Sequence, residues 1–385
     1  MGFLTGRVTY ERFKVGGRDF STFDEKHLET AERFAIGKVG GIAADGIEVG
    51  FTAGDHILDV HFDFEKNVIN DALHLAMRVD TNKVPGDLFK AYMQMELAAL
   101  AANNPSGHPT KSQKQEAREA AEARCEEEAK TGKFKKMKAF PLLWDARQGI
   151  VYFGGSNLTA IERFLSLFKE SFGRTLTRIT AGTLAHDGAA ESGHARALED
   201  LTPAVFAGPK RKISVAWVAD EFGSRDFLGN EFLLWLWWVL ETQSEGIKLA
   251  DESVVTCMLN KTLSLECPLN ETGKETISSE APTRLPEAKR AILGGKLPRK
   301  TGITMVRHEE QYELTLSAES LAVGGAALPK LDSEPGRPML EDRMDQIRHL
   351  SETVDLLFDA FCRRRLSSHW GQDQSGIRHW LEKEE

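Results

Sequence analysis

The order of apolar and polar side chains changes its period several times along the first part of the chain. Residues 7–13 alternate polar with large side chains until Gly16 and Gly17, which predicts a strand. A short polar helix is expected over 22–34. Alternation returns over 56–64, where acidic residues stand between apolar ones, and this pattern predicts a second strand.

The period becomes helical in the next segment. Large apolar side chains recur at helical spacing from Phe89 to Leu100, and prolines follow them. Residues 112–130 are rich in Glu and Ala and hold almost no large apolar side chain, which is typical of a solvent-exposed helix. We therefore interpret residues 85–130 as two helices that stand off a sheet-containing body.

The segment that follows has a local signal for each of its elements. Residues 140–145 and 149–153 predict the two strands of a β-hairpin. Asn157 is a favourable N-cap for a helix whose apolar side chains recur every three or four residues. Gly173 is a natural stop at the C-terminal end of that helix. The order strand, strand, helix is therefore expected here.

The second half opens after residues 181–211, which contain several glycines and prolines and are interpreted as a loop or linker. A strand over 213–219 and an aromatic helix over 227–240 are expected next. We interpret the aromatic helix as core rather than as a platform for stacked bases, because aromatic stripes are usually buried. Later strands are expected over 253–259, 262–266, 303–307 and 312–316, and later helices over 285–293 and 344–361.

Strands and helices in mixed order predict an α+β fold with mixed or antiparallel sheets, flanking helices and a projecting helical arm. The expected division begins with an α+β domain over 1–180, which contains a helical insertion at about 85–130. The linker over 181–211 follows. A second α+β domain over 212–385 ends in the long amphipathic helix.

Composition narrows the class of protein. The 385 residues carry a formal net charge of −9, which excludes a uniformly basic coat on nucleic acid but allows a local basic groove. None of the four cysteines lies in a C-x-x-C pair and no signal peptide is recognisable, so a reducing, cytoplasmic setting is expected. The longest apolar run, 232–240, is far shorter than the roughly 20 residues that span a bilayer, so no membrane contact is expected.

The sequence holds none of the motifs G-x-x-x-x-G-K-[ST], G-x-S-x-G and H-E-x-x-H. Glu287, Ala288 and Lys289 form an E-x-K triplet of the kind found in Mg²⁺-dependent nuclease sites, but such triplets are common on solvated helix faces. We therefore assign no catalytic residue, metal ligand or cofactor and expect a protein that is not an enzyme. A metal-dependent exonuclease that uses Glu287 stays open as an alternative.

Basic residues gather in four clusters. The three clusters assigned to DNA contacts are Lys130, Lys133, Lys135, Lys136 and Lys138; Lys210, Arg211 and Lys212; and Lys289, Arg290, Lys296, Arg299 and Lys300. The fourth, Arg363–Arg365, closes the long C-terminal helix, where cations also stabilise the helix end. Solubilising surface charge explains any one cluster, but four of them in an acidic protein indicate an uneven field that can hold a phosphate backbone. The lysines over 130–138 precede the hairpin and are expected in an exposed connector.

Several segments carry a family resemblance through their order and spacing. They are Thr131-Gly132-Lys133-Phe134 followed by 140–145 and 149–153, then 227–237, then 287–292 with 295–297, and finally 366–370. Together these segments resemble the recombination-associated protein RdgC family. None of them is a catalytic signature.

The resemblance implies an α+β protein that forms a ring-shaped homodimer, with duplex DNA passing through a positively lined hole without strong sequence preference. It also implies association with the nucleoid and restraint of homologous recombination, through competition with a RecA-type recombinase for DNA. Some members of the family are labelled exonucleases, but the family has no agreed catalytic residues. The third hypothesis is a protein-interaction module without DNA binding, in which the acidic helix over 115–129 docks a basic partner.

Overall fold

The computed structural model describes residues 2–17, 22–38, 46–102, 107–207, 224–243, 245–268 and 272–383. Within them the strands are β1 Val8–Val15, β2 Ile47–Thr52, β3 Val68–Ile69, β4 Ala72–Asn82, β5 Lys135–Asp145, β6 Ile150–Phe153, β7 Leu176–Arg178, β8 Ile247–Lys248, β9 Val254–Glu266, β10 Glu275–Ser279, β11 Leu297–Arg307, β12 Glu310–Ser317 and β13 Val323–Ala327. The helices are α1 Glu25–Arg33, α2 Phe64–Asn67, α3 Gly86–Ala102, α4 Lys111–Lys130, α5 Leu158–Phe172, α6 Ala181–Glu191, α7 Ala195–Glu199, α8 Phe227–Thr242, α9 Pro286–Leu293, α10 Arg337–Leu366 and α11 Trp370–Glu382, with a short 3-10 turn, η1, at Pro282–Arg284.

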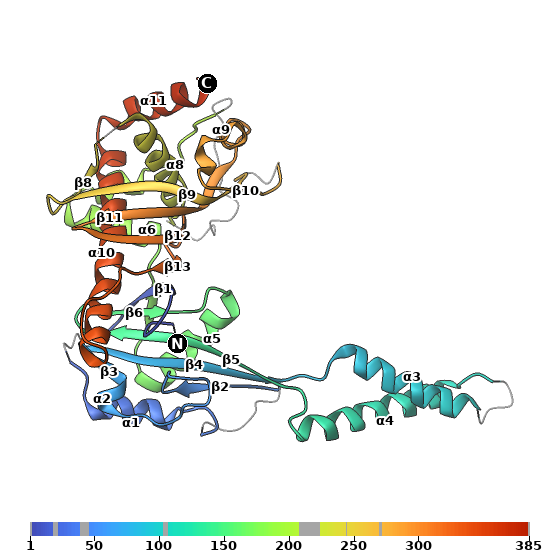
Figure 1. The fold of residues 1–385 in the computed structure, drawn as a ribbon. Helices are drawn as coiled ribbons and strands as arrows, with labels where there is room; N and C mark the ends of the chain where they lie inside the picture. The colour runs from blue at the N-terminus through green and yellow to red at the C-terminus, as the bar shows by residue number, and fades with distance from the viewer. Residues whose placement is uncertain are drawn as a thin grey trace.

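These strands form a long antiparallel sheet with helices packed against it, which confirms the predicted α+β class (Figure 1). The strand order among the described residues is β10-β9-β11-β12-β13-β1-β6-β5-β4-β2. Three short strands lie beside this path: β3 pairs with β4, β7 with β1, and β8 with β9.

Strand β1 joins the two halves of the sheet. Its first residues pair with β13, where Val8 lies opposite Ala326, and its later residues pair with β6, where Glu11 lies opposite Phe153. We call β2 to β7 with α1 to α5 the first lobe, and β8 to β13 with α6 to α9 and α11 the second lobe. Because β1 belongs to both, the sheet passes from one lobe to the other without a break.

A phenylalanine-rich core lies between the first-lobe sheet and α5. Asn157 caps this helix by accepting a hydrogen bond from the N–H of Ala160 at 2.7 Å, and Gly173 ends it with a left-handed φ of 64°. Both helix signals predicted from the sequence are therefore confirmed. Phe153 of the hairpin stacks on Phe164 of α5, with ring centroids 4.2 Å apart, so the predicted apolar stripe forms the core.

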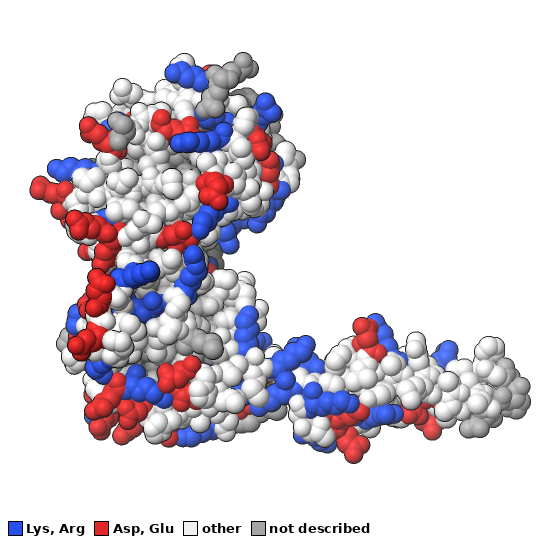
Figure 2. Space-filling model, viewed as in Figure 1, with Lys and Arg blue, Asp and Glu red and all other residues white. Residues whose placement is uncertain are grey.

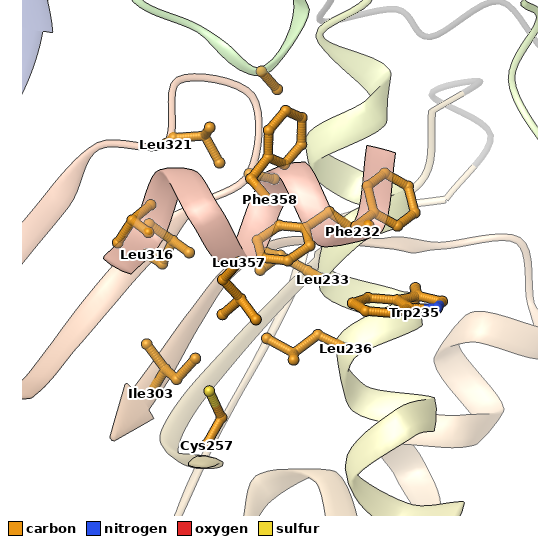
Figure 3. Close-up of a cluster of buried hydrophobic side chains, with 14 of the residues drawn as sticks. Phe232, Leu233, Trp235, Leu236, Cys257, Ile303, Leu316, Leu321, Leu357 and Phe358 are labelled. Atoms are coloured by element: carbon orange, nitrogen blue, oxygen red, sulfur yellow. The ribbon is translucent and has the colours of Figure 1, made fainter. Parts of the chain in front are cut away.

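The aromatic helix α8 lies in the middle of the second-lobe core (Figure 3). Phe232 meets Phe358 of α10 edge to face, with ring centroids 5.4 Å apart, and Leu357 and Ile303 fill the space toward the sheet. Trp237 is 1% exposed. The interpretation of this helix as core is confirmed, because all of its aromatic rings except that of the half-exposed Trp238 are buried.

Helix α10 runs along both lobes and holds them together (Figure 1). Its contacts with the first lobe and with β1 include Arg348 with Asp145 at 2.6 Å, Asp355 with Arg12 at 2.5 and 2.7 Å, and Ser351 with Tyr10 at 2.8 Å. Its contacts with the second lobe include Glu352 with Arg307 at 2.9 Å and Arg365 with Glu231 at 2.6 Å. The apolar face predicted for this helix is buried between these contacts.

A helical arm projects from the first lobe (Figure 1). β4 leads into α3, α4 leads back into β5, and the two helices pack on each other through Tyr92, Ala121 and Cys125. Apart from three buried residues, all residues of the 20-residue helix α4 are exposed or half-buried. The two projecting helices expected over 85–130 are therefore confirmed.

The strand predicted over 56–64 is wrong, because those residues form turns and the start of α2. Leu58 and Val60 are 59% and 49% exposed, and Lys66 binds Asp59 at 3.0 Å and closes the loop. The first-lobe strands on either side, β2 and β4, were not predicted, although large apolar side chains alternate along both: Ile47, Val49 and Phe51 in β2, and Leu73, Leu75, Met77 and Val79 in β4. β4 is buried along nine consecutive residues, so both of its faces are apolar or tightly packed.

The loop or linker predicted over 181–211 is also wrong for residues 181–199, which form α6 and α7. Thr180 caps α6, and the alanines of that helix enter the second-lobe core. Gly182 allows a close approach, since a Cβ there would lie 2.8 Å from the backbone nitrogen of Arg225. Gly182 therefore serves helix packing, whereas Gly193, with a φ of 75°, lies in the turn between α6 and α7. The strand expected over 213–219 lies outside the described residues.

The buried pair between Arg365 and Glu231 predicts a large loss of stability when one partner is removed. Burial raises the pKa of Glu231, and the adjacent Arg365 opposes that shift. Glu231→Ala leaves a guanidinium that is 7% exposed without its carboxylate. We expect the free energy of unfolding, measured by urea denaturation, to fall by about 3–5 kcal/mol.

The matched control breaks an exposed pair on the same helix. Arg363 binds Asp359 at 2.6 Å, and its own side chain is 63% exposed. Arg363→Ala should lower the free energy of unfolding by less than about 0.5 kcal/mol. Equal losses in the two variants would contradict the role given to the buried pair.

Candidate nucleic-acid interface

The first basic cluster lies where the arm leaves the first lobe, a place that we call the neck. β5 is longer than predicted and begins at Lys135, which pairs with Asn82 of β4. Of the lysines expected in an exposed connector, Lys135, Lys136 and Lys138 therefore form the start of a strand instead, whereas Lys130 ends α4 and Lys133 lies in the exposed turn between them. β6 reaches only Leu142, so the stretch of β5 before it borders β4 alone among the described strands. Lysines on such an open edge also discourage pairing with another chain.

Strand alternation divides these lysines between two faces. Lys136 and Lys138 lie on the same face as Phe140, because side chains repeat every second residue along a strand. The Nζ atom of Lys138 lies 4.8 Å from the centre of the Phe140 ring. Lys135 and Met137 lie on the opposite face. The neck therefore presents cations to solvent on both sides.

Two of the lysines are held by carboxylates. Lys135 binds Asp80 at 2.9 Å, and Asp80 also accepts two hydrogen bonds from Arg78. Lys133 binds Glu128 at 2.9 Å. Hydrogen bonds from Tyr92 and Lys133 hold the pKa of the Glu128 carboxyl below its usual value, and the contact with Glu128 raises the pKa of Lys133. Both ion pairs thus fix the positions of the lysine side chains.

The remaining lysines of the cluster have free charges. Lys130, Lys136 and Lys138 are exposed, and the described part of the chain places no carboxylate within ion-pair distance of them. Lys83 joins them, because it is exposed and follows Asn82, the residue opposite Lys135. Lys83 was not predicted as a site residue because no other basic residue lies next to it in the sequence. The register of β4 against β5 is the signal that reveals it.

We name this group the neck lysines: Lys83, Lys130, Lys133, Lys135, Lys136 and Lys138. Figure 2 shows blue side chains gathered at the neck, whereas acidic side chains are prominent on the side of the body away from the arm. A group of cations of this kind can bind the phosphates of a nucleic acid. Lysine ammonium groups carry no base-specific pattern, so such contacts are independent of sequence.

The basic cluster of the second lobe has a different role. Lys296 binds Glu275 at 2.7 Å, and Arg299 binds Glu266 and Glu319 at 3.0 and 2.8 Å. Lys289 lies 3.4 Å from Glu241 and stands over the ring of Trp380. These three cations join elements of the second lobe to each other. Arg290 and Lys300 are exposed, on α9 and β11.

The other two clusters contribute no open cationic surface in the described residues. Lys210, Arg211 and Lys212 lie outside that part of the chain. The fourth cluster is neutralised: Arg363 pairs with Asp359, Arg364 with Asp373 and Arg365 with Glu231. The structure therefore brings together the first cluster at the neck and places the third in the other lobe (Figure 1).

The described residues contain no group of three or more His, Cys, Asp or Glu side chains arranged to hold a metal ion. Glu287, the carboxylate of the alternative nuclease hypothesis, is exposed in the first turn of α9. No helix in this part of the chain combines the length and apolar character needed to cross a bilayer.

No protein-family model matches the chain, and no curated protein matches it either. The function is therefore inferred from the positions of charged and apolar side chains. The neck lysines come from separate segments that the structure brings together: the residue after β4, the end of α4, the turn that follows it, and β5.

The two kinds of neck lysine predict different effects on folding. The double variant Lys136→Glu and Lys138→Glu changes exposed side chains without an ion-pair partner in the described structure, so the free energy of unfolding should change by less than about 0.5 kcal/mol. Lys135→Glu instead places a carboxylate beside Asp80, which is 3% exposed. Urea denaturation should show a loss of more than about 1 kcal/mol for this variant. A larger loss of stability in the double variant than in Lys135→Glu would contradict the division between lysines with and without an ion-pair partner.

Proposed function

We propose that this chain is a sequence-independent duplex-DNA-binding protein that restrains homologous recombination as a ring-shaped homodimer. The observation that carries the proposal is the group of neck lysines on a projecting arm of an otherwise acidic protein. Charge separation of this kind favours binding of a polyanion at one place and repels it elsewhere.

Phosphate contacts explain binding without base recognition. Each lysine that neutralises a phosphate releases a condensed counterion, and this release favours the complex in proportion to the number of contacts. Lys133 and Lys135 are held in place by Glu128 and Asp80, which lowers the entropy that these side chains lose on binding. Lys136 and Lys138 extend freely and can follow the backbone of any sequence.

The exposed face of α3 supports the dimer. Ala91, Met95, Ala98 and Ala102 recur at helical spacing and are exposed, and Met95 is 58% exposed. α4 covers the other face of α3. We assign the exposed face to the arm of a second copy of this chain, since packing two such arms together removes their apolar side chains from water.

The resemblance to the recombination-associated protein RdgC family supports the biological role. In this proposal a dimer encircles duplex DNA, requires no cofactor, and competes with a RecA-type recombinase for the same DNA in the nucleoid. The arms and the neck then have complementary roles: contacts between the arms close the ring, and the neck lysines face the enclosed DNA.

DNA binding is tested by fluorescence anisotropy on two duplexes of unrelated sequence. If about six phosphates are neutralised, the logarithm of the affinity should fall with the logarithm of salt concentration at a slope near −5, for both duplexes alike. The Lys136→Glu and Lys138→Glu double variant should bind at least about tenfold more weakly, with a slope shallower by about two units.

The control for this test carries the same change in charge away from the neck. Lys26→Glu on α1 and Lys248→Glu on β8 reverse two exposed lysines on the side opposite the arm (Figure 1). This variant should keep the parent slope. Equal weakening in both double variants, or a parent slope near zero, would refute the neck interface. Shortening of the DNA in Mg²⁺ would favour the exonuclease hypothesis.

The dimer is tested by light scattering after size-exclusion chromatography over a dilution series. Met95→Lys places a charge in the exposed face of α3 and should raise the dimer dissociation constant at least about tenfold. Glu119→Lys, on the exposed face of α4, is the matched control and should leave the dimer unchanged. A monomeric parent, or equal dissociation of both variants, would overturn the arm contact.

A further inference from the structure

A cavity of about 390 Å³ opens in the second lobe between η1, α9 and the C-terminal end of α11. It lies in the other lobe from the neck (Figure 1). Leu285, Leu293 and Leu381 form apolar walls, and Leu293 is 42% exposed. A volume of this size is at the lower end of the range for ligand sites, enough for a large side chain and its neighbours.

Cations surround this apolar cavity. Arg284, Arg290 and Lys383 line it and are exposed, whereas Lys289 also lines it but is paired with Glu241 at 3.4 Å. Glu382 is the one carboxylate among the described lining residues. The cavity is therefore positive at its rim and apolar within.

We propose that this cavity binds an acidic peptide segment of a partner protein, with one large apolar side chain inside and carboxylates against the rim. Arginine guanidinium groups suit carboxylates because they can donate two parallel hydrogen bonds. Contact with the leucine walls stabilises the complex only when the group that enters is apolar, because the group and the leucines are then both removed from water. Charge complementarity thus selects the acidic residues, and the walls select the apolar one.

The leucines distinguish this partner from duplex DNA. A phosphate backbone would satisfy Arg284 and Arg290 but would leave Leu293 against a hydrated, charged strand. Arg290, assigned to DNA by the sequence pattern, therefore has a different role here. The cavity and the neck lysines belong to different lobes, so the protein can hold a peptide partner while its neck binds DNA. The inference goes beyond the proposed function and does not depend on it.

The test uses a fluorescein-labelled peptide of four acidic residues followed by leucine and phenylalanine, titrated with the full chain. The parent should bind it, and the Arg284→Glu and Arg290→Glu double variant should bind at least about tenfold more weakly. Leu293→Ser should also weaken binding, with no change in fold because the side chain is exposed. Peptides with amides in place of the acids, or serines in place of the two apolar residues, should bind at least about tenfold more weakly.

Two controls separate this inference from the DNA interface. The Lys136→Glu and Lys138→Glu variant should bind the peptide as the parent does, whatever its affinity for DNA. Saturating duplex DNA should leave peptide binding unchanged. Absence of peptide binding by the parent would overturn the proposal. Displacement of the peptide by DNA, together with weaker DNA binding of the Arg284→Glu and Arg290→Glu variant, would assign the cavity to the DNA surface instead.

Discussion

The long helix α10 is the element on which the arrangement of the two lobes depends. A sheet as long as this one would twist and bend freely at β1 if nothing bridged its two parts. α10 crosses that joint and is held by Asp145 in the first lobe, Arg12 on β1 and Glu231 in the second lobe. Its apolar face is buried at the same time. The arm and the neck therefore project from a rigid body in one direction.

Ion pairs decide which basic residues are available for a partner. Most arginines near the lobe centres, such as Arg299 and Arg365, join elements that are distant in sequence. Their charge is satisfied within the protein. Four of the neck lysines, Lys83, Lys130, Lys136 and Lys138, are exposed and have no carboxylate within ion-pair distance in the described structure. A count of charges along the sequence treats the two groups alike, although only the second has charge to offer.

Local signals carried most of what the sequence could predict. Asn157 and Gly173 mark the ends of α5, because helix capping depends on only a few neighbouring residues. The polar composition of α4 correctly predicted that this helix is exposed. The strand β4 was not predicted although it carries a local signal, since Leu73, Leu75, Met77 and Val79 alternate along it and enter the first-lobe core. Lys83 carries no such signal: its place beside Lys135 follows from strand register, which no local pattern contains.

The position of β1 has a consequence for how the chain reaches its native state. Arg7 donates a hydrogen bond to the carbonyl of Gly325, 318 residues further along the chain. Closing so long a loop lowers the conformational entropy of the chain before the contacts that compensate for this loss can form. Folding is slower when a protein has more contacts between distant residues. During synthesis β1 can pair with β6 and wait for β13 to leave the ribosome. The seam between β1 and β13 then closes last, and until it does the edge of β1 is open to strands of neighbouring chains.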